Sequence, residues 1–219
     1  MEKWSHFRKK ASGMVKMQEV SPLNLRGMQV FKGLLAPEEQ GRLVNDLRDV
    51  VREVPLFHPV TPSGKTMSVR MTSAGQFGWI TDAKGYRYSK AHPSGQGWPA
   101  IPEMALKVWS KVSGATRAPE TCLINFYDAG AKMGLHQDRD EQDFTQPVVS
   151  ISLGDEALFR VGNETRGGKT ESLWLASGDV VVMGGTSRLL YHGIDRVKPQ
   201  SSTLLPKGGR INLTLRVVT

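Results

Sequence analysis

A histidine and an aspartate with one residue between them, His136 and Asp138, stand in the run GLHQDRDE. On extended backbone, side chains two residues apart point to the same side of the chain, so both could approach one metal ion. Such pairs are also common by chance, and many histidines are simply hydrogen-bonded structural residues, so the pair alone leaves both interpretations open. A metal site would need a third ligand from elsewhere in the fold, and His192 in the run LLYHGI is the natural candidate.

Two histidines and one carboxylate form the facial triad of non-haem Fe(II) oxygenases, which leaves coordination positions open for a co-substrate and O₂. Further polar residues stand in the last β-like run of the chain. Polar and apolar residues alternate there, in the order Arg210, Ile211, Asn212, Leu213, Thr214, Leu215, Arg216 and Val217. Because successive side chains of a strand point to opposite faces, the polar residues would share one face.

That polar face has two interpretations. On an ordinary surface strand it would lie in water. Inside a barrel it could bind a small dicarboxylate, because arginine binds carboxylates through a rigid fork of donors and neutral side chains add hydrogen bonds. In the run CLINFY, Asn125 and Tyr127 share one side and could add polar contacts inside the same barrel. A position at the edge of a sheet would explain these two residues equally well.

Such residues need elements to position them, and the sequence predicts two helices that precede a β-rich region. The first helix is predicted over residues 37–54, because Pro37 suits a first helical turn and apolar residues recur at helical spacing up to Val54. The second is predicted over residues 102–113, where an apolar stripe ends at the stop signal Gly114.

After residue 120, short β-like runs follow one another, and many are separated by glycine, proline, asparagine or aspartate. The runs are TCLINFY, VVSISLG, ALFRV, ESLWLA, DVVVMGG, RLLYHGI and INLTLRVV. They predict an all-β barrel or sandwich. The segment between the two helices, residues 61–99, is rich in glycine, proline, serine and aromatic residues. A long irregular segment within a compact domain is usually functional or disordered, and its aromatic residues argue against disorder.

Composition limits the class of protein. The chain has 219 residues, enough for one domain with a substantial core, and no apolar run approaches the roughly 18 residues of a membrane span. The lone cysteine, Cys122, cannot form an internal disulfide, which fits a reducing cytoplasm. The formal net charge of +8 favours polyanionic partners, although many basic proteins carry nothing more than a solvated basic surface. Residues 1–20 are predicted to form a basic N-terminal extension, because they lack the apolar stretch of a secretory signal.

Several further motifs occur in a consistent order from about residue 30 to residue 219. They are TPSGKTMSV, FGW with GYRYS, CLINFYDAGAKMGLHQDRDE, SISLG, GDVVVMGG, YHGI and RINLTLR. Together they resemble the AlkB family of Fe(II)/2-oxoglutarate-dependent dioxygenases. An ordered set of motifs is far more specific than a histidine–aspartate pair.

The resemblance implies a mainly β fold with flanking helices, formed as one catalytic domain over residues 1–219. A double-stranded β-helix (jelly-roll) core over about residues 120–219 would follow a nucleotide-recognition lid over about residues 55–100. The cofactors would be Fe(II), 2-oxoglutarate and O₂. Fe(II) would bind His136, Asp138 and His192. The residues that would hold 2-oxoglutarate are Asn125, Tyr127, Arg210, Asn212 and Arg216, with Arg210 at the distal carboxylate and Arg216 nearer the end that chelates iron.

The resemblance also implies contacts to the substrate. Trp79 and Tyr86 match lid positions that contact the nucleotide, with Tyr88 nearby, although core packing would also explain such aromatic residues. Asp140 matches a position that touches the exocyclic amino group of the damaged base. Arg166 falls near a position of substrate contact, in a loop that aligns poorly.

The implied activity is oxidative dealkylation of N-alkylated bases such as 1-methyladenine and 3-methylcytosine in DNA or RNA, which releases formaldehyde while 2-oxoglutarate and O₂ give succinate and CO₂. The partner would be alkylated nucleic acid and no membrane, and the chain would be a cytoplasmic monomer. Lys65 and Arg70 are candidate phosphate contacts.

Three other interpretations stay open. A 2-oxoglutarate dioxygenase that acts on protein or on a small molecule would lack an aromatic lid of the size of a base. A nucleic-acid-binding module with a structural metal, or a cupin-like metal protein, would leave the Arg210 face without a purpose.

Overall fold

The computed structural model describes residues 17–219, so most of the predicted N-terminal extension lies outside the described residues. Its helices are α1 (Pro37–Glu53) and α2 (Glu103–Val112), which confirm both predicted helices to within one residue at each end. At the start of α1, the backbone N–H of Ala36 donates to the carboxylate of Glu39 at 2.8 Å, and this bond satisfies one group that the helix itself cannot pair. No helix in this part of the chain is both long enough and apolar enough to cross a membrane.

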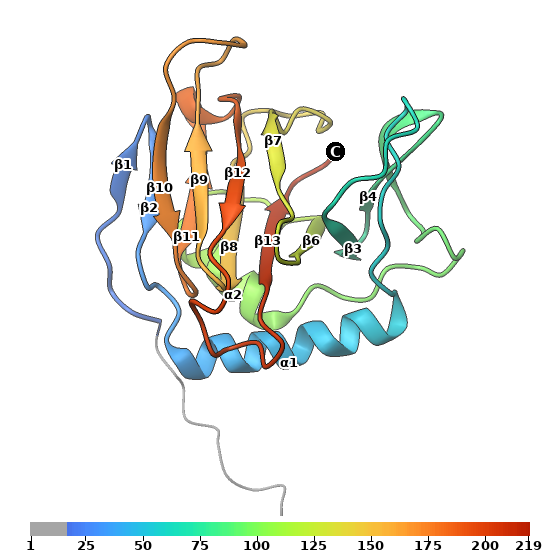
Figure 1. The fold of residues 1–219 in the computed structure, drawn as a ribbon, viewed down its shortest axis with the longest axis horizontal. Helices are drawn as coiled ribbons and strands as arrows, with labels where there is room; N and C mark the ends of the chain where they lie inside the picture. Colours follow the sequence, from blue (N-terminus) through green and yellow to red (C-terminus); the bar gives the residue numbers. More distant parts are fainter. Residues whose placement is uncertain (1–16) are drawn as a thin grey trace, which may run out of the picture.

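Two antiparallel sheets form the body of the molecule (Figure 1). The major sheet has the strand order β1 (Leu23–Leu25), β2 (Met28–Phe31), β11 (Val180–Met183), β8 (Val148–Gly154), β13 (Arg210–Arg216), β6 (Thr121–Tyr127) and β3 (Arg70–Gly75). The minor sheet has the order β10 (Glu171–Leu175), β9 (Ala157–Val161), β12 (His192–Val197) and β7 (Met133–His136). The two sheets with flanking helices confirm the predicted mainly β, jelly-roll architecture.

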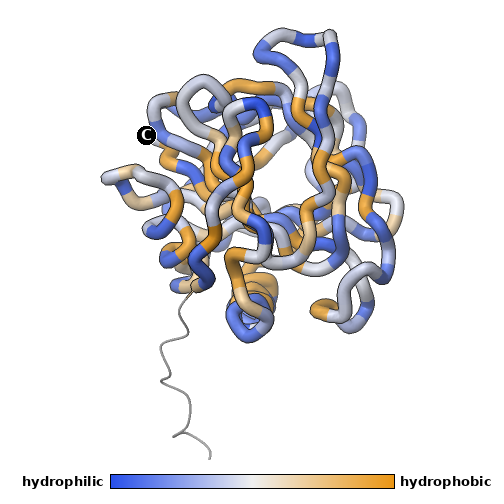
Figure 2. The backbone as a smooth tube through the Cα atoms, turned by 90° about the vertical axis from the view of Figure 1, so that its left-hand side faces the viewer, coloured by the Kyte–Doolittle hydropathy of each residue, from blue (hydrophilic) through white to orange (hydrophobic). Residues whose placement is uncertain are grey.

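Apolar side chains form two cores, one on each face of the major sheet. The first packs the apolar stripes of α1 and α2, such as Leu47 and Val108, against sheet residues such as Leu213. The second lies between the sheets and joins residues such as Val148 and Phe159. Along the backbone, short hydrophobic and hydrophilic segments follow one another (Figure 2).

The register of the central strands places the predicted polar face between the sheets. On β13, Arg210 is paired with Tyr127 of β6, and Asn212 is paired with Asn125 of β6 and with Ser152 of β8. The intervening residues, such as Leu213, pack in the helix-side core. The alternation predicted for these two strands is therefore confirmed, and their polar residues point into the molecule instead of into water.

The segment between the helices has two parts. Its first strand, β3, pairs with β6 as an edge of the major sheet, whereas β4 (Gly78–Asp82) and β5 (Gly85–Ser89) form a separate hairpin beside it (Figure 1). A Cβ atom at Gly78 would lie 2.2 Å from the ring of Trp98, so only glycine lets the hairpin approach that ring. Of the range predicted as a lid, β3 thus belongs to the sheet, and the β4–β5 hairpin stands over its edge.

The prediction that the run RLLYHGI forms a strand is wrong over most of its length. A short 3₁₀ turn, η1 (Gly185–Ser187), precedes it, and β12 starts only at His192. Arg188 is buried and its side chain donates to backbone oxygens of another loop, so the apolar residues beside it belong to a turn. β12 instead extends beyond the run, to Val197.

Candidate metal and dicarboxylate site

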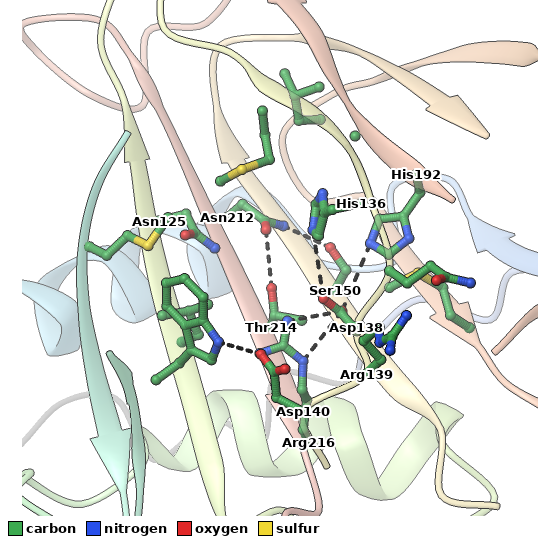
Figure 3. A pocket seen from close by; sticks show the side chains of 18 of the residues that line it. Asn125, His136, Asp138, Arg139, Asp140, Ser150, His192, Asn212, Thr214 and Arg216 are labelled. Carbon is green, nitrogen blue, oxygen red and sulfur yellow. Dashed lines mark hydrogen bonds and ion pairs between the residues drawn. The ribbon is translucent and has the colours of Figure 1, made fainter. Parts of the chain in front are cut away.

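A cavity of about 610 Å³ opens between the two sheets beside the β4–β5 hairpin. All of the residues predicted to bind iron, 2-oxoglutarate or the base line it, namely Trp79, Tyr86, Asn125, Tyr127, His136, Asp138, Asp140, Arg166, His192, Arg210, Asn212 and Arg216, whereas Lys65 and Arg70 do not. Figure 3 shows many of these side chains converging from strands of both sheets. The fold therefore brings the predicted site residues together in one place.

Strand pairing in the minor sheet joins the three candidate metal ligands. His136 ends β7 and His192 begins β12, and the two residues are directly paired. Asp138 follows in the loop after β7, with its carboxylate oxygens 3.6 Å from Nε2 of His136 and 3.8 Å from Nε2 of His192. One ligand atom from each residue lies within 4.8 Å of the other two (Figure 3). Such spacing suits a shared metal ion.

Hydrogen bonds to the backbone orient both imidazole rings. Nδ1 of His136 lies 2.9 Å from the carbonyl oxygen of Gly134, and Nδ1 of His192 lies 3.0 Å from that of Leu190. A carbonyl oxygen only accepts, so each ring carries its proton on Nδ1 and turns the lone pair of Nε2 toward the space that the two rings share with Asp138. Metal-binding histidines are usually fixed in this way.

The charges around the ligands favour the protonation states that a metal needs. Burial would raise the pKa of Asp138, but the charge of Arg216, 2.9 Å away, and the two nearby histidines outweigh it and hold the pKa well below its usual value. Burial, and then the charge of His136, lowers the pKa of His192 to about 4. A carboxylate and two imidazole nitrogens form the donor set that Fe(II) takes, and so the residues present fit this metal.

The surroundings of Arg210 indicate which kind of small molecule could bind beside the metal. Its side chain is buried, and its Nη2 donates to Ser152 Oγ at 3.1 Å. Among residues 17–219, Nε and Nη1 are buried without a hydrogen-bond partner, as is Oδ1 of Asn125. Burial lowers the pKa of Arg210 to about 10, and no carboxylate of the described chain is paired with it. A buried, unpaired guanidinium is costly, and a carboxylate of 2-oxoglutarate would satisfy it.

The other residues predicted to hold 2-oxoglutarate are engaged to different degrees. Asn212 donates to Ser150 Oγ at 2.7 Å and to the carbonyl oxygen of Ile151 at 3.2 Å, so protein groups already use its amide nitrogen. Arg216 is bound to Asp138 and lies 3.4 Å from Glu141. Burial raises the pKa of Tyr127 to about 12, which keeps its hydroxyl protonated as a donor at neutral pH. Tyr127 and Arg210 are therefore the better-placed free donors.

The residues predicted to contact a base lie at the mouth of the cavity. The rings of Trp79 and Tyr86 are stacked, with centroids 5.6 Å apart, and Tyr86 is half exposed, which argues against simple core packing. Nε1 of Trp79 donates to Asp140 at 2.8 Å. Arg166 is exposed, and its guanidinium lies 5.4 Å from the centre of the Tyr191 ring.

Sequence reasoning missed a buried ion pair beside the candidate metal ligand Asp138. Arg188 and Glu141 pair at 2.9 Å with almost no exposed side-chain surface, and Arg188 also donates to the backbone oxygen of Asp138 at 2.6 Å. The Tyr88 hydroxyl donates to Glu141, which links the hairpin to the same network. The position of Glu141, three residues after Asp138, was the one signal in the sequence, and nothing there pointed to Arg188.

Comparison with known proteins agrees with this geometry. The model of the 2OG-Fe(II) oxygenase superfamily matches residues 27–216. An alpha-ketoglutarate-dependent dioxygenase AlkB homolog of Caulobacter vibrioides is 49% identical over 191 residues, which cover 87% of each chain. The DNA N(6)-methyladenine demethylase ALKBH1C of Arabidopsis thaliana is 31% identical over 87% of this chain and 48% of its own length. The solved structure of OsALKBH1 is similar with a TM-score of 0.74 at 30% identity, and the match covers 91% of this chain and 100% of that one.

Proposed function

Because the chain belongs to the 2OG-Fe(II) oxygenase superfamily, we propose that it is an Fe(II)/2-oxoglutarate-dependent dioxygenase that removes alkyl groups from nitrogen atoms of nucleic-acid bases. One observation carries the proposal. The candidate iron ligands, the unpaired Arg210 and the stacked pair of Trp79 and Tyr86 all line one cavity. The first two features fit an oxygenase of this superfamily, and the third adds an aromatic surface of the size of a base.

We assign His136, Asp138 and His192 to the iron, and Arg210 to the distal carboxylate of 2-oxoglutarate, with Asn125 and Tyr127 as further contacts. When bound, iron, 2-oxoglutarate and O₂ supply the oxidising chemistry that hydroxylates the alkyl carbon of the substrate. The hydroxymethyl group then leaves the nitrogen as formaldehyde, and the base is restored. Arg216 keeps Asp138 ionised and in place, while apolar residues such as Phe159 and Leu175 limit the access of water to the cavity.

The mouth of the cavity suits a cationic base. Methylation at the positions that block pairing gives 1-methyladenine or 3-methylcytosine a positive charge, and such unpaired bases leave a stack at lower cost. An electron-rich ring such as that of Trp79 attracts a cation, and Asp140 adds a negative charge beside it. We therefore propose that Trp79 and Tyr86 stack on the extruded base and that Asp140 accepts from its exocyclic amino group.

Cations around the mouth would hold the phosphates of the strand. Lys65, Lys132, Arg139 and Arg166 are exposed and form no ion pair within the part of the chain that the structure describes. Arg139 and Arg166 line the cavity, and Lys132 precedes the lining residue Met133. Arg70, also expected to contact phosphate, is paired with Asp128 at 3.0 Å, so Lys65 is the better candidate of the two named from the sequence.

The remaining expectations form part of the same proposal. We expect a monomer with one catalytic domain over residues 1–219, in the cytoplasm. The relative from Arabidopsis is named as a DNA demethylase, which supports nucleic acid as the partner. The buried free Cys122 is compatible with a reducing compartment.

The test compares candidate substrates by the amount of succinate that forms from 2-oxoglutarate in the presence of each. Oligonucleotides with and without 3-methylcytosine, methylated peptides and free methylated nucleosides would be supplied with Fe(II), ascorbate and 2-oxoglutarate. Stimulation of succinate release by the methylated oligonucleotide supports the proposal. Stimulation by a peptide or a small molecule alone would keep the dioxygenase and contradict the nucleic-acid substrate.

A further inference from the structure

The loop that carries Arg166 is tied to the metal-ligand segment by the side chain of Gln137. This residue lies between His136 and Asp138, and its Nε2 donates to the carbonyl oxygens of Glu164 at 3.0 Å and Leu189 at 2.6 Å. Since both partners can only accept, the amide nitrogen must face them. Gln137 therefore uses both of its N–H groups to join two loops that are distant in the sequence.

The same loop, residues 162–170 between β9 and β10, has few other anchors near Arg166. The backbone of Asn163 accepts from the N–H of Tyr191 at 2.9 Å, and its side chain donates to the carbonyl oxygen of Gly167 at 3.0 Å. Within the described part of the chain, the bond from Gln137 is the one hydrogen bond that reaches residues 164–166. Arg166 itself is exposed, and its guanidinium lies 5.4 Å from the centre of the Tyr191 ring. Arg26 also donates to the side chain of Asn163 at 2.5 Å and to the backbone of Lys169 at 3.3 Å, so the two ends of the loop are held, and among described residues Gln137 supplies the bond nearest Arg166 at its tip.

We propose that Gln137 is a positioning residue, whose amide fixes the Arg166 loop against the iron-ligand segment so that the Arg166 guanidinium meets the substrate strand. The proposal deepens the proposed function, because it assigns Arg166 to nucleic acid. Arginine has many rotamers, and ordering it on a mobile loop would cost conformational entropy at each binding event. A loop that is already fixed lowers that cost.

The first experiment measures the loop without any substrate. Trypsin cleaves after arginine, and Arg166 is exposed. Gln137→Met keeps the length of the side chain and removes both donors, whereas Gln137→Glu places an acceptor against two carbonyl oxygens. We expect cleavage after Arg166, identified by mass spectrometry, to be about tenfold faster in Gln137→Met, because each lost hydrogen bond lowers the free energy of local opening.

We expect still faster cleavage in Gln137→Glu. The matched controls are Gln142→Met and Gln142→Glu, at an exposed position in the same segment whose side chain makes no hydrogen bond among the described residues. Their cleavage rates should equal that of the wild type. Equal cleavage of the wild type and both Gln137 variants would overturn the proposal.

The second experiment is a double-mutant cycle with Arg166→Ala, read by fluorescence anisotropy of an oligonucleotide that contains 3-methylcytosine. The proteins carry Mn(II) and 2-oxoglutarate, and their metal content is measured so that loss of metal is not mistaken for loss of contact. Gln137→Met should weaken binding about tenfold in the wild type but less than about twofold in Arg166→Ala, because coupled residues are not additive. The same loss in both backgrounds would overturn the proposal.

The two experiments separate this proposal from the proposed function. A wild-type protein that binds methylated and unmethylated oligonucleotides equally well would contradict the proposed substrate. The trypsin comparison would still decide whether Gln137 holds the loop.

Discussion

Trp79 and Asp140 are 61 residues apart in the sequence, yet the indole Nε1 of Trp79 donates a hydrogen bond to Oδ2 of Asp140 at 2.8 Å. Trp79 lies on β4, and Asp140 lies two residues beyond the metal-ligand candidate Asp138. The bond therefore joins the β4–β5 hairpin to the loop that carries this candidate iron ligand. It also holds a negative charge beside the aromatic surface at the mouth of the cavity.

Two substitutions of Trp79 should separate these contributions. Trp79→Phe keeps a ring beside Tyr86 and removes the donor, and it should weaken binding of an oligonucleotide with 3-methylcytosine by about tenfold, since a hydrogen bond to a charged group is worth about 1.5 kcal/mol or more. Trp79→Ala also removes the stacking surface, which is worth about 1–3 kcal/mol per base, and should weaken binding further. Fluorescence anisotropy measures both, with Trp174→Phe, an exposed tryptophan on β10, as the control. Wild-type affinity in Trp79→Ala would contradict the role of the aromatic pair.

Arg210 should show a conflict between stability and binding. It is buried with two nitrogen atoms unpaired, so Arg210→Met should raise the free energy of unfolding of the ligand-free protein by about 1–4 kcal/mol. The same change should weaken 2-oxoglutarate binding by at least about thirtyfold, because truncating a buried partner of a charged ligand costs about 2–5 kcal/mol. Urea denaturation and calorimetric titration give the two quantities. A variant that is less stable and still binds 2-oxoglutarate normally would contradict the assignment.

The buried pair of Arg188 and Glu141 should stabilise the loop that carries Asp138. Arg188→Met leaves Glu141 without one of its buried partners and also removes the donor to the backbone of Asp138. The free energy of unfolding should fall by about 3–5 kcal/mol, measured by urea denaturation. Arg196→Met, at an exposed position on β12, is the control and should change it by less than about 0.5 kcal/mol. If the free energy of unfolding changed by a similar amount in both variants, the buried pair would contribute no more to stability than an exposed ion pair.

The cations at the mouth should appear in the salt dependence of nucleic-acid binding. Arg139 is exposed, lines the cavity and has no ion-pair partner among the described residues, so Arg139→Ala should lower affinity for any strand sequence. The slope of log K against log salt should become shallower by about 0.7–0.9, the value for one phosphate contact. Arg52→Ala is the control, because Arg52 lies on α1 and is paired with Asp49. If the slope of log K against log salt did not change in Arg139→Ala, the nucleic-acid strand would not contact Arg139.

Much of the fold follows from local sequence patterns. The helix over residues 37–54 was recognisable because Pro37 and a continuous apolar stripe mark it, and β6, β8 and β9 coincide with runs of β-branched and apolar residues. The short strands β1, β2 and β7 have three or four residues each, too few to show a period, and were not predicted. The run RLLYHGI looked like a strand because its apolar residues are contiguous, but tertiary bonds of Arg188 hold it as a turn.

The site was predictable to a lesser extent. The ordered motifs indicated which residues would gather, and these residues do line one cavity. How they pair was not visible, because the partners are far apart in the sequence: Arg216 binds Asp138 from a strand 78 residues later, and Arg70 is held by Asp128. The two bonds of Gln137 also depend on where other loops arrive. Hydropathy and spacing report on neighbours along the chain, whereas these contacts are set by the packing of the two sheets.

The most direct test of the proposed function is the mass of an oligonucleotide that carries one 3-methylcytosine, measured after incubation with the protein, Fe(II), ascorbate and 2-oxoglutarate. We predict that the strand loses the mass of one CH₂ group, that formaldehyde and succinate appear in equal amounts, and that His136→Ala abolishes all three changes. An oligonucleotide of unchanged mass, with metal-loaded protein that still converts 2-oxoglutarate to succinate, would contradict the proposed substrate. If the His136→Ala variant converted 2-oxoglutarate to succinate at the rate of the wild type, the assigned iron site would be contradicted.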